Sequence, residues 1–141
     1  MNLFRITEFR ANWFSAVKGL LPQLTDSETG FNEDFFAHLV QLPDTFLLAA
    51  EEDERILGIL TLTLYRIPTG VQARIDDVVV DKAARKRGIG RALMEEALRI
   101  CTRHKVGAVH LTSHPRRTAA NRLYQTLGFE PYQTNVYVKR L

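Results

Sequence analysis

The chain of 141 residues is 45% hydrophobic and 25% charged, the ordinary balance of a globular domain, and its length predicts one domain spanning residues 1–141. No apolar run approaches the ~20 residues that a membrane helix needs. The net charge of +3 is modest, and the single cysteine, Cys101, cannot form an internal disulfide, so we expect a cytoplasmic protein.

Apolar periodicity in the first half of the chain predicts a strand, two helices and a hairpin of strands. Asn32 is suited to the N-cap of the second helix, and Pro22 and Pro43 are expected to end the two helices. The expected elements are a strand at residues 4–7, helices at about 10–21 and 33–42, and strands at 45–51 and 56–66.

The second half of the chain predicts strands that alternate with helices. Gly107 and Gly128 follow the two expected helices, where glycine commonly ends a helix. The expected elements are a strand at residues 73–80, a helix at about 89–104, a strand at 108–113, a helix at about 118–127 and a closing strand or strand pair within 132–139. This order predicts an α/β fold in which helices flank a mixed sheet.

A basic loop that contains two glycines joins the strand at residues 73–80 to the helix that follows it. Gly88 and Gly90 lack Cβ, so the backbone can turn tightly and approach a ligand closely. Their N–H groups fall at a helix N-terminus, whose unpaired donors and partial positive charge favour phosphate. The surrounding cations are Lys82, Arg85, Lys86, Arg87 and Arg91. The loop therefore predicts a pyrophosphate site.

The spacing of this loop excludes two common phosphate-binding motifs. No Gly-Lys-Ser or Gly-Lys-Thr is present, and Leu93 stands where a dinucleotide-binding motif needs its third glycine. The pattern that remains is R/Q-x-x-G-x-G/A, and here the sequence resembles the GNAT superfamily of N-acetyltransferases. Residues 75–80 and 123–129 resemble the same family, in the same order and spacing.

The resemblance covers nearly the whole chain and implies a GNAT-like fold, with a central mixed sheet splayed between its fourth and fifth strands. It implies acetyl-coenzyme A as the co-substrate and no metal. The backbone of the fourth strand would pair with the pantetheine arm as an added strand does. The cofactor-binding residues that the resemblance implies are Val78, Val79, Val80, Arg85, Lys86, Arg87, Gly88, Ile89, Gly90, Arg91 and Asn121.

Three side chains are candidates for moving protons. Tyr124 occupies the tyrosine of the family pattern L-Y-x-x-x-G-F, which implies a general acid beside the cofactor sulfur. Asp76 and Asp77 are candidates for the base, or for ordering a water that carries the proton. Successive strand residues point to opposite faces, so we expect at most one of the two to line the site.

The sequence departs from the family pattern at Arg117, where many members have an asparagine seven residues before the tyrosine. Either Asn121 replaces that contact or Arg117 reaches a phosphate, and both arginines at 116–117 also suit a solvated surface. Cys101 lies on an apolar helix face, which favours core packing. The histidines lack the spacing of a metal site.

The function predicted is transfer of the acetyl group of acetyl-coenzyme A directly to an amine, with residues 23–36 and 130–138 forming the acceptor site that the resemblance implies. The acceptor, a small molecule or an amine of a protein or peptide, is left open, as is the oligomeric state, with a homodimer among the alternatives. One alternative is a non-catalytic acyl-coenzyme A binding or sensing domain of the same fold. Another is a nucleic-acid binder, against which stand the modest charge and the absence of stacking aromatics in the basic loop. We expect neither a nucleic-acid nor a membrane partner.

Overall fold

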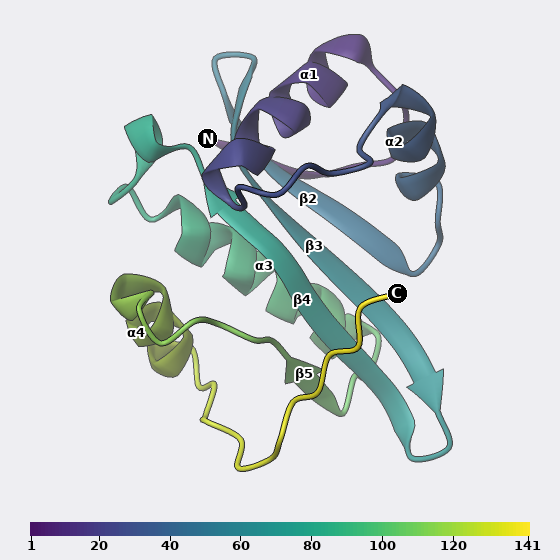
Figure 1. Cartoon of the computed structure of the whole chain (residues 1–141), viewed down its shortest axis with the longest axis vertical. Helices are drawn as coiled ribbons and strands as arrows, with labels where there is room; N and C mark the ends of the chain where they lie inside the picture. The colour runs from purple at the N-terminus through teal and green to yellow at the C-terminus, as the bar shows by residue number, and fades with distance from the viewer.

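Two long neighbouring strands, β3 (Arg55–Ile67) and β4 (Gly70–Val80), form the centre of a five-stranded sheet in the computed structural model, which describes residues 1–141 (Figure 1). The sheet order is β1-β2-β3-β4-β5, with antiparallel neighbours except for β5, which is parallel to β4. The other elements are β1 (Asn2–Ile6), α1 (Ala11–Leu20), α2 (Glu33–Leu39), β2 (Thr45–Glu52), α3 (Ile89–Arg103), β5 (Ala108–His110) and α4 (Thr118–Thr126), with 3-10 turns η1 (Leu21–Gln23) and η2 (Lys82–Ala84).

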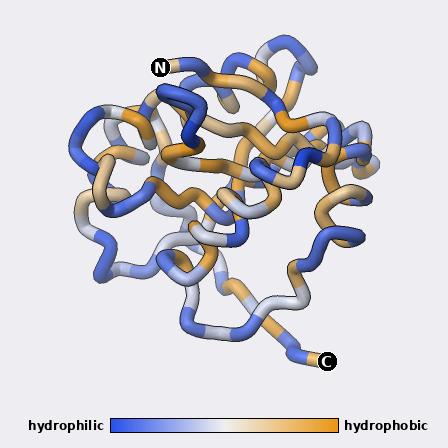
Figure 2. Tube along the Cα trace, turned by 90° about the horizontal axis from the view of Figure 1, so that it is seen from above, coloured by the Kyte–Doolittle hydropathy of each residue, from blue (hydrophilic) through white to orange (hydrophobic).

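The two faces of the sheet carry separate hydrophobic clusters, because successive strand side chains point to opposite faces. Leu48, Leu60 and Leu62 are buried against the apolar face of α3. Leu47 and Ile59 are buried on the other face, among apolar side chains of α1 and α2. Figure 2 shows hydrophobic residues along segments in the middle of the molecule and hydrophilic residues on many of its outer turns. The α/β fold with helices on both faces is therefore confirmed.

Helix ends follow the signals expected from the sequence. The Asn32 side-chain oxygen accepts a hydrogen bond of 2.8 Å from the N–H of Phe35, as a helix N-cap does. Gly128 has φ of +91° just after α4, in the left-handed conformation that favours glycine. No helix of the structure combines the length and apolar character that crossing a membrane requires.

The strands β4 and β5 touch over only a short stretch. Gln72, Ala73 and Arg74 of β4 pair with the three residues of β5. Beyond that point β4 continues to Val80, whereas the chain leaves β5 toward α4 (Figure 1). The last part of β4 consequently has no strand neighbour on that side, which is the splay that the resemblance implied.

The expected closing strand is absent. Residues 132–139 form no strand, and β5 ends at His110 rather than near residue 113. Alternating apolar residues suggested a strand, but Tyr132 and Tyr137 are 77% and 84% exposed, so neither is buried against the sheet. The three-residue β5 offers a short edge, and a strand without a paired neighbour gains no ladder of hydrogen bonds.

Candidate functional site

A cleft of about 670 Å³ lies between the unpaired part of β4 and the start of α4. This volume is within the range of typical small-molecule sites. One wall is formed by Val78, Val79 and Val80, and the other by residues 116–120 together with Leu123 and Tyr124. The apolar middle of the cleft suits an extended, largely uncharged ligand segment.

The loop after β4 brings backbone amides to one end of the cleft. Gly88 is the N-cap of α3 and has φ of +78°, a conformation that residues with a side chain rarely adopt. Gly90, in the first turn of α3, lines the cleft. A Cβ at Gly90 would lie 3.7 Å from Val80 Cγ2 and 3.9 Å from Leu123 Cδ2, so any larger side chain would extend into the space between the two walls.

The side chains around this loop divide into two groups. Arg85 and Lys86 line the cleft, and Arg85 is fixed there by a 3.1 Å hydrogen bond from its Nε to the Val80 carbonyl. Arg87 instead pairs with Glu52 at 2.7 Å, and its guanidinium holds the pKa of that carboxyl below its usual range. Arg91 pairs with Glu95, also at 2.7 Å. Ile89 is 2% exposed, and its side chain packs in the core.

Tyr124 stands at the other end of the cleft. Its ring is 7% exposed and meets Phe129 edge-on at 6.1 Å between ring centroids. The residue lines both the cleft and a smaller cavity of about 170 Å³. The hydroxyl makes no hydrogen bond within the chain and is not sealed in the interior, so it is available to a ligand.

The smaller cavity holds both aspartates of β4. Asp76 and Asp77 line it together with Val78, Arg117 and Tyr124. The expectation that at most one aspartate lines the site is wrong, because a β-bulge interrupts the alternation. Ile59 pairs with Val79 and Thr61 pairs with Asp76, so two residues of β4 oppose one residue of β3. Asp77 is the bulged residue with φ of +50°.

The two carboxylates differ in environment. Partial burial, and then the neighbouring charge of Asp76, raise the pKa of Asp77 above its usual range. Asp76 is held by Arg74, whose Nε donates to both carboxylate oxygens at 3.0 Å. A raised pKa brings the Asp77 carboxylate closer to the working pH of a general base.

Asn121 does not line the cleft. Its Nδ2 donates a 3.1 Å hydrogen bond to the His114 carbonyl, within the turn before α4. Arg116 and Arg117 line the cleft instead. Arg117 could be found from the sequence, because it stands where many family members have an asparagine that contacts the donor. Nothing in the sequence distinguished Arg116 from a solvated residue.

Gln23, beyond α1, begins the segment 23–36 that the resemblance assigned to the acceptor site, but its contact with the basic loop was not expected. It lines the cleft, and its Oε1 accepts a 2.8 Å hydrogen bond from the Lys82 N–H, which ties the end of α1 to the basic loop. Leu24 follows it and lines both the cleft and the small cavity. A polar residue after a helix carries no signal in the sequence that would assign it to a distant loop.

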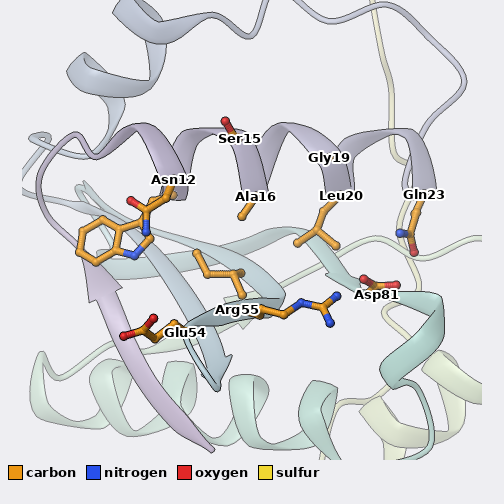
Figure 3. A pocket seen from close by; sticks show the side chains of 11 residues that line it. Asn12, Ser15, Ala16, Gly19, Leu20, Gln23, Glu54, Arg55 and Asp81 are labelled. Atoms are coloured by element: carbon orange, nitrogen blue, oxygen red, sulfur yellow. The ribbon is translucent and has the colours of Figure 1, made fainter.

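A second hollow, of about 350 Å³, lies on the far side of Gln23, between α1 and the β2–β3 turn (Figure 3). Side chains of α1 such as Asn12 and Leu20 reach down toward Glu54 and Arg55. Its charged side chains carry both signs, with Asp81 beside Arg55. Unlike the cleft, whose charged side chains are all positive, this hollow has no net preference for an anion.

The chain is similar in sequence to known acetyltransferases. Residues 10–129 match the model of the acetyltransferase (GNAT) family. A mycothiol acetyltransferase from Renibacterium salmoninarum is 33% identical over 86 residues, which are 60% of this chain. The match spans 25% of that protein, about a quarter of its length.

Solved structures share the fold over nearly the whole chain. A putative acetyltransferase from Agrobacterium tumefaciens has a TM-score of 0.87 at 21% identity, covering 99% of this chain and 100% of that one. An aminoglycoside acetyltransferase from an uncultured soil metagenomic sample has a TM-score of 0.86 at 17% identity, covering 99% and 95%. A ribosomal-protein-alanine N-acetyltransferase from Brucella melitensis biovar Abortus has a TM-score of 0.77 at 21% identity, covering 100% of both chains.

Proposed function

Because this chain belongs to the GNAT family of acetyltransferases, we propose that it transfers the acetyl group of acetyl-coenzyme A directly to an amine. The observation that carries the proposal is that the cleft lined by Arg85 and Lys86 and the small cavity lined by the two aspartates share Val78, Arg117 and Tyr124. Acetyl-coenzyme A has the matching order of parts, with phosphates at one end and a thioester at the other.

The residues present fit this donor at the phosphate end. The cleft is lined by cations and by no aspartate or glutamate, and Gly90 leaves the first amides of α3 open to a ligand. We infer that Arg85, Lys86 and the amides around Gly88 and Gly90 hold the diphosphate. Arg87 and Arg91 are already paired with glutamates and would contribute less.

The exposed edge of β4 fits the pantetheine arm. The Val80 carbonyl accepts from the Arg85 side chain, so the backbone of Val80 faces the open side of the strand. The backbone of Val78 faces the same side in an extended strand, and Val78 lines both the cleft and the small cavity. We infer that the Val78 N–H polarises the thioester carbonyl, as an oxyanion-hole donor does.

Two side chains would then move the protons. When bound, acetyl-coenzyme A supplies an activated acetyl group whose thiolate leaves as the amine attacks. The Asp77 carboxylate would accept the proton of the amine, directly or through a water. The Tyr124 hydroxyl would donate a proton to the thiolate, for which its ring position between the cleft and the small cavity is suited.

The acceptor would enter beside the aspartates, which attract a cationic amine. Relatives of this fold are named for aminoglycosides and for the alanine of a ribosomal protein, and both are amine acceptors. We therefore infer a small-molecule amine or an amine of a protein or peptide as the acceptor. A cytoplasmic location stays a prediction that rests on the lone Cys101, which is buried.

The test combines donor binding with turnover. Titration calorimetry would measure the binding of acetyl-coenzyme A, and a chromogenic thiol assay would follow thiol release with a panel of aminoglycosides, amino acids and peptides. Mass spectrometry would identify the acetylated product, and the double variant Asp77→Asn/Tyr124→Phe is the inactive control. Donor binding with no product from any acceptor would instead favour the non-catalytic binding domain. Absence of donor binding would refute the proposal.

A further inference from the structure

One face of the sheet changes from apolar to polar at the level of the small cavity. Ile59 of β3 is buried in the cluster beneath α1 and α2. The next residues of β3 on this face are Thr61 and Thr63, and Asp76 and Arg74 of β4 lie directly opposite them. No helix covers this part of the face (Figure 1). The sheet therefore has an open polar surface that begins where Asp76 lines the small cavity.

An ion pair between Arg74 and Asp76 joins this polar surface to the cavity. The Arg74 Nε donates to both carboxylate oxygens of Asp76 at 3.0 Å. The two side chains are 45% and 42% exposed, so a ligand can approach the pair from solvent. The two terminal nitrogens of Arg74 make no hydrogen bond within the chain. They are free to donate paired hydrogen bonds to a second carboxylate.

The surroundings of the pair add hydrogen-bonding groups but no further fixed charge. His110 of β5 lies beside Arg74 on the same face, and its Nε2 is 3.2 Å from Gln72 Oε1. The ring of Tyr132, within the segment 130–138 that the resemblance assigned to the acceptor, is 6.5 Å from the His110 ring. A surface with one cation beside one anion complements a ligand that carries one charge of each sign, whereas a ligand with several cations would be repelled by Arg74.

We propose that Arg74 and Asp76 hold the acceptor, and that the acceptor is a free α-amino acid, whose carboxylate binds Arg74 and whose ammonium group binds Asp76. This inference rests on the proposed function and narrows its acceptor. An α-amino acid carries both charges on one carbon, so it can reach two side chains that touch each other. Its amine would then lie at the cavity that Asp77 and Tyr124 also line.

This placement is consistent with the balance of the transfer. The bond between the amine nitrogen and the acetyl carbon forms as the carbon–sulfur bond breaks. The ammonium group loses two protons in all. Asp77 passes one of them to solvent, and the other is balanced by the proton that Tyr124 gives to the thiolate.

The experiment compares the standard L-amino acids with their α-carboxamides as acceptors, using the intact chain, acetyl-coenzyme A and the thiol-release assay. An aminoglycoside serves as an amine without a carboxylate. The variants are Arg74→Gln and Arg74→Lys. Arg66→Gln is the matched control, because Arg66 also forms an exposed ion pair, with Asp44, but follows Tyr65 on β3 and so points to the opposite face. Thermal unfolding would verify that each variant is folded.

We expect at least one amino acid to have a kcat/KM ~10–100-fold above that of its carboxamide, as the loss of charge-assisted hydrogen bonds predicts. Arg74→Gln should remove this preference, mainly by raising KM for the amino acid. Arg74→Lys should keep part of the preference because it keeps the charge, and Arg66→Gln should keep all of it.

Three results would contradict the inference in different ways. A wild type that acetylates carboxamides or the aminoglycoside as well as it acetylates amino acids would overturn the amino-acid site and leave the proposed function standing. Equal losses for amino acid and carboxamide in Arg74→Gln would also overturn it, because Arg74 would then only position Asp76. A wild type that acetylates no amine would refute the proposed function itself.

Discussion

The Tyr124→Phe substitution separates catalysis from binding more cleanly than any other change in this chain. The ring is 7% exposed and packs against Phe129, and phenylalanine keeps that packing. The hydroxyl has no hydrogen-bond partner in the chain, so its removal breaks no contact within the protein. We therefore expect the free energy of unfolding and the affinity for acetyl-coenzyme A to change little.

Turnover should fall if the hydroxyl protonates the leaving thiolate. A positioned acid contributes about 10²–10⁴-fold to the rate. At 1.36 kcal/mol for each factor of ten, this is a barrier increase of about 2.7–5.4 kcal/mol.

The measurements are kcat and KM from thiol release at saturating acceptor, with donor affinity from calorimetry. Tyr65→Phe is the matched control, because Tyr65 is 37% exposed and lies on β3, outside the cleft. Full turnover of Tyr124→Phe with its best acceptor would remove the tyrosine from the mechanism and leave the thiolate to water. A parallel loss of donor affinity would instead show that the hydroxyl binds rather than donates.

Three further predictions concern the rest of the site. Gly90→Val should abolish acetyl-coenzyme A binding in calorimetry while the chain stays folded. Gly90→Ala, whose Cβ meets only ordinary contacts, should retain part of the binding. Unchanged affinity of the valine variant would refute the inference that Gly90 leaves the helix amides open to the diphosphate. Arg85→Ala should weaken binding, most strongly at low salt, and Arg87→Ala much less because Glu52 already pairs with Arg87; equal losses at every salt concentration would contradict this. Asp77 has a raised pKa, so the folded state binds its proton more tightly than the unfolded chain and stability falls as pH rises above the usual aspartate range. Asp77→Asn should therefore raise the midpoint of thermal unfolding at pH 7 and lower kcat, and a lower midpoint at pH 7 with normal folding at pH 4 would reverse the sign of the argument.

Much of the fold could be predicted from the sequence, because its determinants are local. Asn32 caps α2 through its own side chain, and Gly128 ends α4 through its own φ angle. The apolar periods of α3 and β3 match the faces that those elements bury. The strand predicted within residues 132–139 is absent because a strand needs a neighbour to pair with. Alternation along one segment does not reveal whether the neighbouring strand, here the three-residue β5, is long enough to pair with it.

The site was predicted less completely, because parts of it depend on contacts between distant segments. The structure brings Arg85, Gly90 and Tyr124, which the motif singled out, to one cleft. The motif did not distinguish Arg85, which lines the cleft, from Arg87, which pairs with Glu52 at the end of β2. That pairing is set by the sheet and is invisible in the spacing of the basic loop.

The bulge at Asp77 links backbone, electrostatics and proposed chemistry at one residue. A regular strand would have placed Asp76 and Asp77 on opposite faces, with one of them away from the cavity. The extra residue brings both to the cavity that Tyr124 also lines, and it leaves Asp77 at φ of +50° with a raised pKa. Both features reduce the stability of the folded state at neutral pH. Asp77 thus lowers stability through both its backbone conformation and its raised pKa, and it lies beside Tyr124 in the small cavity. This combination is what we expect of a residue that serves catalysis rather than folding.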